Sequence, residues 1–253
     1  MKGYRSVTQN PLMPTPHDRF VMTHVVAPAV VFLVAAAVLA TTQLDIAIAD
    51  RLFYDFDAAR WIGKDTWWAK NLIHTGGRNL MRTLALLSLT LLIVASLRPS
   101  LARLRRPAGF MFACLALVPL IAGTLKQTTN VDCPWDYQRY GGTRPHVDLF
   151  EDRPDELPRA ACFPGAHSSS AFALVGLYFL GLARSRKHAL AGLGVGLLTG
   201  AVFAFGQEAR GAHLLSHDLY SAFLAWFICV TLYAWPFRRS VMSGPDTRRV
   251  NRS

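Results

Sequence analysis

Residues 189–205, ALAGLGVGLLTGAVFAF, hold no charged side chain and approach the length that a helix needs to cross a bilayer. Five other blocks are similarly apolar, running from about Phe20 to Ala40, Leu80 to Leu97, Phe110 to Leu125, His167 to Ala183 and Leu219 to Trp235. Of the 253 residues, 52% are apolar and 17% charged, a composition too apolar for most soluble folds. We therefore predict one all-α domain over residues 1–253, a polytopic membrane protein with six transmembrane helices. The fourth block, His167 to Ala183, is marginal by itself, and a buried core helix of a soluble protein is its alternative.

The distribution of Lys and Arg predicts the orientation in the membrane. If both termini are cytoplasmic, the inner segments carry 15 of these residues, against 11 in the longer outer segments. The bias gives the orientation only; we predict a multi-pass protein of the bacterial inner membrane whose outer segments face the periplasm. The net charge of +11 then lies mostly at the cytoplasmic lipid surface, and the absence of interleaved aromatic residues argues against nucleic-acid binding. A cleaved signal peptide is an alternative for the first block, but its removal would leave five spans.

The outer segments differ in character. Residues 43–79 contain Trp61, Trp67 and Trp68, which are typical of an interfacial helix at the level of the lipid headgroups. Residues 126–166 are polar and rich in Pro, Gly and acids, so we expect an irregular extracytoplasmic cap loop. Within the fifth block, Gly192, Gly196 and Gly200 recur every four residues and predict close contact with another helix.

Four cysteines fall into two kinds. Cys114 and Cys229 lie within apolar blocks, where a thiol behaves as a small buried side chain. Cys133 and Cys162 lie near the two ends of one outer loop, and in an oxidising compartment we expect them to form a disulfide. No C-x-x-C pair is present, and we predict neither a metal site nor a cofactor.

Ionisable side chains gather at the outer ends of the last four blocks: Lys126, then His167 within CFPGAHSSSAF (residues 162–172), then Arg210 with His213, and finally His217 with Asp218. One such residue is commonly a cap or a snorkelling side chain, but the whole set on one membrane face indicates function. Two cations can hold phosphate oxygens while one imidazole attacks phosphorus and another protonates the leaving oxygen. Backbone N–H groups near Ser168, at a helix start, would also face an anion.

This set resembles the type-2 phosphatidic acid phosphatase family, whose signatures are Lys-x6-Arg-Pro, Pro-Ser-Gly-His and Ser-Arg-x5-His-x3-Asp. KQTTNVDCP supplies Lys126 and Pro134, with Cys133 at the position of the arginine. PGAH supplies Pro164 and His167. QEARGAHLLSHD places His213 at the nucleophile position, and the remaining positions depart from the family: Gln207 replaces the arginine, His217 the aspartate, and Arg210 and Asp218 are out of register.

The resemblance implies a metal-independent integral membrane phosphatase acting on lipid monophosphates or diphosphates through a phosphohistidine. His213 would be the nucleophile and His167 the general acid, with Lys126, Arg210, Ser168 and Gln207 binding phosphate. On a regular helix His217 shares a face with His213 while Asp218 is turned away, so either is a candidate for orienting the nucleophile. His217 as nucleophile is less favoured, because Ser221 follows it four residues later.

The sequence does not choose among phosphatidic acid, phosphatidylglycerol phosphate, polyprenyl diphosphates and lipid A as the substrate. Three alternatives also remain open: a lipid phosphotransferase of the same family, a non-catalytic protein that binds lipid headgroups, and a transporter. The expected partners are the lipid phosphate substrate and membrane lipids.

Overall fold

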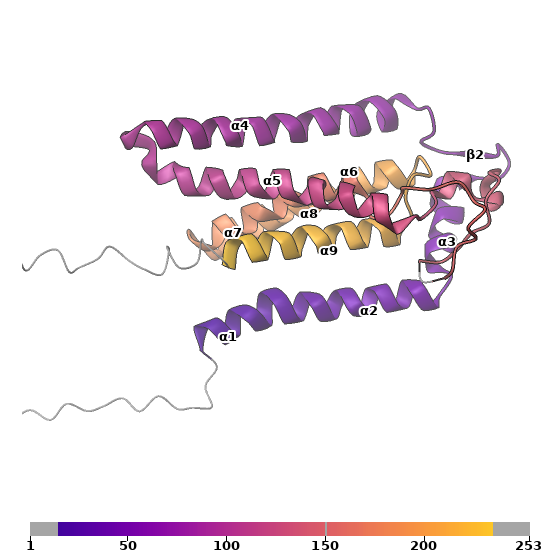
Figure 1. Cartoon of the computed structure of the whole chain (residues 1–253), viewed down its shortest axis with the longest axis horizontal. Coiled ribbons are helices and arrows are strands. Elements are labelled where there is room, and N and C mark those ends of the chain that lie inside the picture. Colours follow the sequence, from indigo (N-terminus) through magenta and orange to yellow (C-terminus); the bar gives the residue numbers. More distant parts are fainter. Residues whose placement is uncertain (1–14, 150, 235–253) are drawn as a thin grey trace, which may run out of the picture.

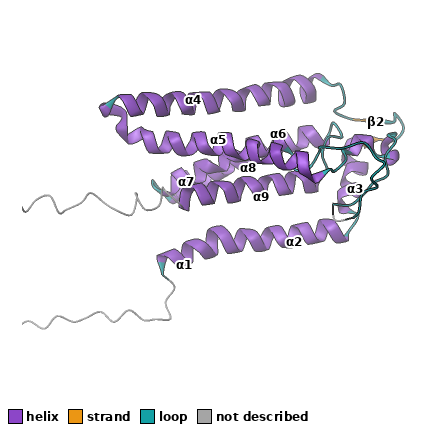
Figure 2. Cartoon of the chain, in the orientation of Figure 1, coloured by secondary structure: helices purple, strands orange, loops and turns teal. Residues whose placement is uncertain are grey.

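The computed structural model describes residues 15–149 and 151–234. The predicted tail from Pro236, most of the N-terminal tail, and Trp235 lie outside the described residues. Long helices run side by side along one direction (Figure 1), and the described strands form one short pair (Figure 2). The prediction of an all-α membrane protein is confirmed.

The first long helix is built from α1 (Pro16–Val21), one wider π-helical turn (Met22–Val26) and α2 (Ala27–Thr41). Thr15 caps its start by accepting a hydrogen bond from the Asp18 N–H, and the chain becomes extended at Thr42. There α3 (Leu44–Ile48) and a π-helical turn (Ala49–Phe53) lie across the end of the bundle rather than along it (Figure 1). We call this end, which also carries the polar loop, the cap end.

The predicted interfacial helix around Trp61, Trp67 and Trp68 is wrong in its placement. Trp61 belongs to β2 (Arg60–Trp61), which pairs with β1 (Tyr54–Asp55), and its indole is buried against Gly211. The turn between these strands is fixed by Asp55, whose carboxylate accepts hydrogen bonds from two following N–H groups. Trp68 opens a π-helical segment (Trp68–Gly76) that continues directly into α4 (Gly77–Leu97). The short helix that lies across the bundle is α3, which ends at Ile48, 13 residues before Trp61.

A second pair of long helices follows. A turn (Pro99–Leu101) joins α4 to α5 (Ala102–Thr129), and the two helices pack along each other (Figure 1). The helix α5 continues past the predicted end at Leu125 and stops at Asn130, which adopts the left-handed conformation. Lys126 therefore lies on the last turn of a helix and not in a loop.

The last third of the chain holds three apolar helical segments. The first is a continuous run of α6 (Ala166–Phe172), a tight turn (Ala173–Val175) and α7 (Gly176–Leu182), followed by α8 (Arg186–Glu208) and α9 (Leu215–Leu232). Within the described residues, five helices are long and apolar enough to cross a membrane, and Ala166–Leu182 is shorter. The count of six spans stays a prediction, although α1 begins and α9 ends at the same end of the bundle, as six crossings require (Figure 1).

The glycine stripe of α8 makes the predicted close contact. A Cβ at Gly192 would lie 2.6 Å from the backbone carbon of Leu177, and one at Gly196 would lie 2.5 Å from the nitrogen of Val175. At Gly200 it would overlap the ring of Phe172. Because no side chain separates the helices, α8 fixes the position of the α6–α7 run, which carries His167.

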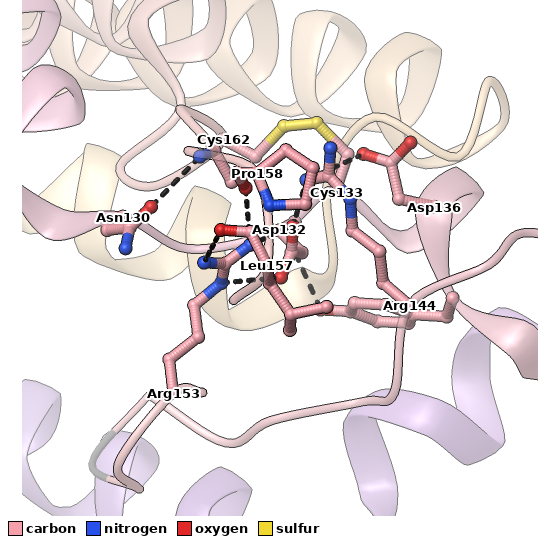
Figure 3. Close-up of polar contacts among 11 residues, drawn as sticks. Asn130, Asp132, Cys133, Asp136, Arg144, Arg153, Leu157, Pro158 and Cys162 are labelled. Carbon is pink, nitrogen blue, oxygen red and sulfur yellow. Dashed lines mark hydrogen bonds and ion pairs between the residues drawn. A yellow bond between two sulfur atoms is a disulfide. The ribbon is translucent and has the colours of Figure 1, made fainter. Parts of the chain in front are cut away.

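The cap loop is irregular, as predicted, and is held by a polar cluster (Figure 3). Cys133 and Cys162 form the predicted disulfide. The buried Asp132 carboxylate forms an ion pair with Arg144. It also accepts a hydrogen bond from Nε of Arg153 at 2.8 Å. Two short turns (Pro134–Asp136 and Gln138–Tyr140) follow the first cysteine.

The same loop is joined to the rest of the cap end. The Trp135 N–H donates to the Gly211 carbonyl at 2.9 Å, which links the cap to the α8–α9 connection. The Cys162 N–H donates to the Val131 carbonyl at 3.0 Å. The cap thereby ties the end of α5, the start of α6 and the α8–α9 loop together, and these are the segments that carry the candidate residues.

Candidate active site

A cavity of about 440 Å³ opens at the cap end between α4, α5, α6 and α8. Four predicted site residues line it: Lys126, His167, Gln207 and His213. Its other polar lining residues were not identified from the sequence: His74, Arg78, Arg82 and Ser170. Met81, Ala85, Leu115 and Pro119 continue the wall along the apolar part of α4 and α5. A cationic rim therefore adjoins a hydrocarbon-like surface, an arrangement suited to an amphiphilic anion.

His213 lies in the connection before α9 and is 2% exposed. Its Nδ1 is 2.9 Å from Oδ1 of Asp218. When Asp218 is ionised it only accepts hydrogen bonds, so Nδ1 then carries the proton and Nε2 keeps its lone pair. Burial, followed by the charges of Lys126 and Arg210, lowers the pKa of His213 to about 3. The imidazole is therefore neutral at ordinary pH, as a nitrogen nucleophile must be.

His217 has a different environment from His213. Since α9 begins only at Leu215, residues 213–218 do not form one regular helix, and the expectation that His217 shares a face with His213 is wrong. Asp218, and not His217, makes the contact with His213. The rings of the two histidines are 5.9 Å apart at their centroids, and the buried Nδ1 of His217 has no hydrogen-bond partner among the described residues.

The turn before α6 packs directly against the His213 ring. A Cβ on Gly165 would overlap the imidazole, so only glycine allows this approach. Three serine hydroxyls surround the Gly165 carbonyl oxygen, at 3.1 Å from Ser168, 2.7 Å from Ser169 and 3.0 Å from Ser221. These contacts hold the turn in place and join α6 to α9.

His167 stands one residue into α6 and faces the same cavity as His213. Its ring stacks on Phe203, with centroids 4.6 Å apart and an interplanar angle of 16°. The ring of His74 lies 4.6 Å away on the basis of centroids. The buried Nε2 of His167 has no partner among the described residues, so this nitrogen is available to a bound group.

Arg210 and Ser168 do not line the cavity, whereas the other two predicted phosphate-binding residues, Lys126 and Gln207, do. The Arg210 guanidinium donates to Oε1 of the buried Gln207 at 2.8 Å. Arg210 does not line the cavity; it orients the Gln207 amide that does. The side chain of Ser168 is fully buried beside Gly165, while Ser170 reaches the cavity wall.

A match to a family model covers residues 107–240 and bears the description PAP2 superfamily. The chain belongs to the PAP2 superfamily. Together with the apolar helical fold, this membership supports a phosphatase function at a membrane. Comparisons with curated proteins and with solved structures give no match.

The PAP2 match contains all the motif residues named from the sequence, but it begins after α4. His74, Arg78 and Arg82 therefore belong to the cavity without belonging to the matched region. A sequence signal for them did exist: the three are spaced four residues apart, which places them on one helical face, and Arg82 interrupts an apolar block. Position 133, where the family motif has arginine, holds Cys133, whose side chain is bonded to Cys162 in the disulfide.

Glu208 is a further buried acid that the sequence analysis did not single out. Its carboxyl interacts with that of Asp218, and both line a largely apolar cavity between α2, α8 and α9. Asp218 thus has His213 on one side and a second acid on the other. No cluster of potential metal ligands is found among the residues that the structure describes.

Proposed function

We propose that this protein is an integral membrane lipid phosphatase that works through a phosphohistidine on His213. The observation that carries the proposal is the His213–Asp218 pair, with its 2.9 Å contact, at the wall of a cation-rimmed cavity. Nε2 of His213 would attack phosphorus, forming a P–N bond as the P–O bond to the lipid breaks. Asp218 would hold the imidazole in the reactive tautomer and stabilise the positive charge that develops on it.

His167 would act as general acid and then as general base. In the first step it would give a proton to the leaving lipid oxygen. In the second step it would take a proton from the water that attacks the phosphohistidine, and inorganic phosphate would be released. The free Nε2 of His167 in the same cavity supports this assignment.

Lys126 and Gln207 would bind the phosphoryl oxygens at the centre of the site. Both line the cavity, and the Arg210 side chain fixes the Gln207 amide from behind. Arg210 would thus act mainly through Gln207 and through its charge. We propose that the cap end faces the periplasm of a bacterial inner membrane, in line with the Lys/Arg distribution.

The test is phosphate release from a panel of lipid phosphates by protein purified in detergent, with acid-labile phosphoenzyme trapped in parallel. Wild-type protein should turn over at least one lipid, form the phosphoenzyme and keep its activity in EDTA. Its activity should be bell-shaped in pH, because the nucleophile must be neutral and the acid protonated. Stable turnover without any phosphoenzyme, or complete inhibition by EDTA, would contradict the proposal.

A substitution of His167 separates its role from that of the nucleophile. His167→Ala should slow hydrolysis of an alkyl monophosphate by about 100-fold or more, but slow an aryl phosphate less, because a good leaving group needs little protonation. Equal losses on the two substrates would show that His167 is not the general acid.

A further inference from the structure

Two arginines of α4 form a cationic face toward the cavity. Arg78 and Arg82 are one helical turn apart, with His74 a further turn before them, and all three line the cavity that contains Lys126 and His213. Residues four apart lie on the same side of a helix, so the shared lining is a consequence of their spacing.

Neither guanidinium has a carboxylate partner among the residues that the structure describes. Three arginines of the cap contrast with them: Arg139 binds Asp50, and Arg144 and Arg153 bind Asp132. None of the described lining residues of the cavity is an acid. Arginines near the end of a membrane-spanning helix often extend to the headgroup level, but two that line the same cavity as a candidate nucleophile are candidates for binding a ligand.

The charge in the cavity exceeds what one transferred phosphoryl group needs. Lys126 already stands on the His213 side, with the Gln207 amide beside it. A phosphate monoester carries about −1.5 to −2 charge at neutral pH, whereas Lys126, Arg78 and Arg82 together carry +3, so the cavity has positive charge left for a second anionic group. Guanidinium groups are also suited to paired hydrogen bonds with phosphate oxygens.

We propose that Arg78 and Arg82 bind the second, non-transferred phosphate of a lipid diphosphate. The assignment rests on the proposed function and names the substrate class of the same site. His213 Nε2 forms a bond to the terminal phosphorus, and the bond from that phosphorus to the bridging oxygen breaks. The lipid monophosphate leaves with the electron pair, and the two guanidinium groups stabilise its negative charge. Water then cleaves the P–N bond to give inorganic phosphate.

The apolar wall fits the rest of such a substrate. Met81 lies between the two arginines on α4 and Ala85 follows them, while Leu115 and Pro119 line the same cavity from α5. A lipid chain along these residues would leave its diphosphate at the rim, with the inner phosphate beside α4 and the outer phosphate beside His213. Arg78 and Arg82 then take over the binding of phosphate that Cys133, held in its disulfide, cannot provide.

The test compares farnesyl diphosphate with farnesyl monophosphate on wild-type protein, Arg78→Gln, Arg82→Gln and the double variant. The double variant should lose about 100-fold in kcat/KM for the diphosphate, through lost charge-assisted hydrogen bonds, and about 3-fold or less for the monophosphate. Arg60→Gln is the matched control, because Arg60 is exposed at the same end of the molecule but does not line the cavity. Arg82→Lys should recover part of the diphosphate activity.

Equal losses on the two substrates, or an unchanged diphosphate rate, would overturn the subsite. The proposed function fails only if wild-type protein hydrolyses no lipid of the full panel. If it hydrolyses neither farnesyl compound, binding alone decides the subsite. Inorganic pyrophosphate should then bind the double variant at least 10-fold more weakly than wild type in calorimetry, with Arg60→Gln unchanged. Equal binding would refute the subsite independently of catalysis.

Discussion

Two cavities at the cap end lie on either side of the start of α9, and their charges are opposite. The cavity of about 440 Å³ contains His213 with Lys126, Arg78 and Arg82. The cavity of about 230 Å³ contains His217 with Asp45, His146, Asp148 and Glu151. Burial raises the pKa of Asp45 in the second cavity, while it lowers the pKa of His213 in the first.

The comparison teaches which histidine suits chemistry on an anion. Both are almost fully buried and only four residues apart. His213 has a carboxylate at Nδ1 and shares its cavity with Lys126 and two arginines, so an incoming phosphate meets a neutral nucleophile in a positive field. A phosphate beside His217 would meet several acidic side chains instead. The environment distinguishes two residues that the motif spacing leaves ambiguous.

The largest expected effect comes from removing the two histidines separately. His213→Ala should reduce kcat by about 10⁴-fold or more, as the loss of a nucleophile does in other enzymes, and abolish the phosphoenzyme. His217→Ala should reduce kcat by about 10-fold or less. Phosphate release and phosphoenzyme trapping on the same preparations measure both. The reverse order of losses would break the comparison and make His217 the nucleophile.

Asp218 should come next. Asp218→Asn keeps the shape of the side chain but no longer requires the proton on Nδ1 of His213, and a similar change in a protease triad costs about 10⁴-fold. We expect a loss of about 10³- to 10⁴-fold in kcat with KM nearly unchanged. Asp45→Asn, in the acidic cavity, is the control and should retain activity within about 3-fold. A larger loss for Asp45→Asn than for Asp218→Asn would contradict the pairing of Asp218 with His213.

Gly165 should show a moderate effect. The Cβ of Gly165→Ala would overlap the His213 ring, so the imidazole must shift, and we expect kcat to fall by about 10- to 100-fold. Gly123→Ala serves as the control, because a Cβ there meets no atom within 4 Å. Kinetics and thermal melting of both variants test this. Equal activity of the two alanine variants would mean that the ring tolerates displacement.

The smallest effect concerns the acid stability of the protein. The pKa of His213 is lower in the folded chain than in the unfolded chain, so the unfolded chain binds more protons below about pH 6.5. This contribution is complete above that pH and is lost as the pH falls toward the folded value of about 3. Melting temperatures from pH 7 to 4 should fall less steeply for His213→Asn than for wild type. Parallel slopes would refute the contribution.

The membrane fold could be predicted from the sequence because uninterrupted apolar blocks of bilayer length have few other uses. The contact of Gly192, Gly196 and Gly200 could be predicted for a similar reason, since small residues on one face permit close packing. The position of the interfacial helix could not be predicted. An exposed tryptophan at a membrane surface and a buried one like Trp61 have the same sequence signature, and only the fold decides between them.

The candidate site could be predicted only in part. Lys126, His167, Gln207 and His213 meet at one cavity, while Arg210 and Ser168 stand behind it. The contact of Asp218 with His213 depends on the residue at which α9 begins and on the conformation of the loop before it. That loop includes Gly211 with a positive φ, which the spacing of the motif does not reveal. Arg78 and Arg82 were missed because an arginine near the end of a span is commonly a snorkelling side chain. Their place in the cavity that contains His213 depends on the packing of α4 against α5.

The bond between Cys133 and Cys162 also affects how the protein would withstand a protease. A cut within the intervening 29-residue separation opens the chain but leaves both pieces covalently attached on either side of the cavity. Arg144 and Arg153 lie between the two cysteines and form ion pairs with Asp132. These ion pairs would keep the new chain ends in place after many of the possible cuts. A nicked molecule would therefore migrate as one band until reduced, and its His167 and Lys126 would stay neighbours despite the broken chain.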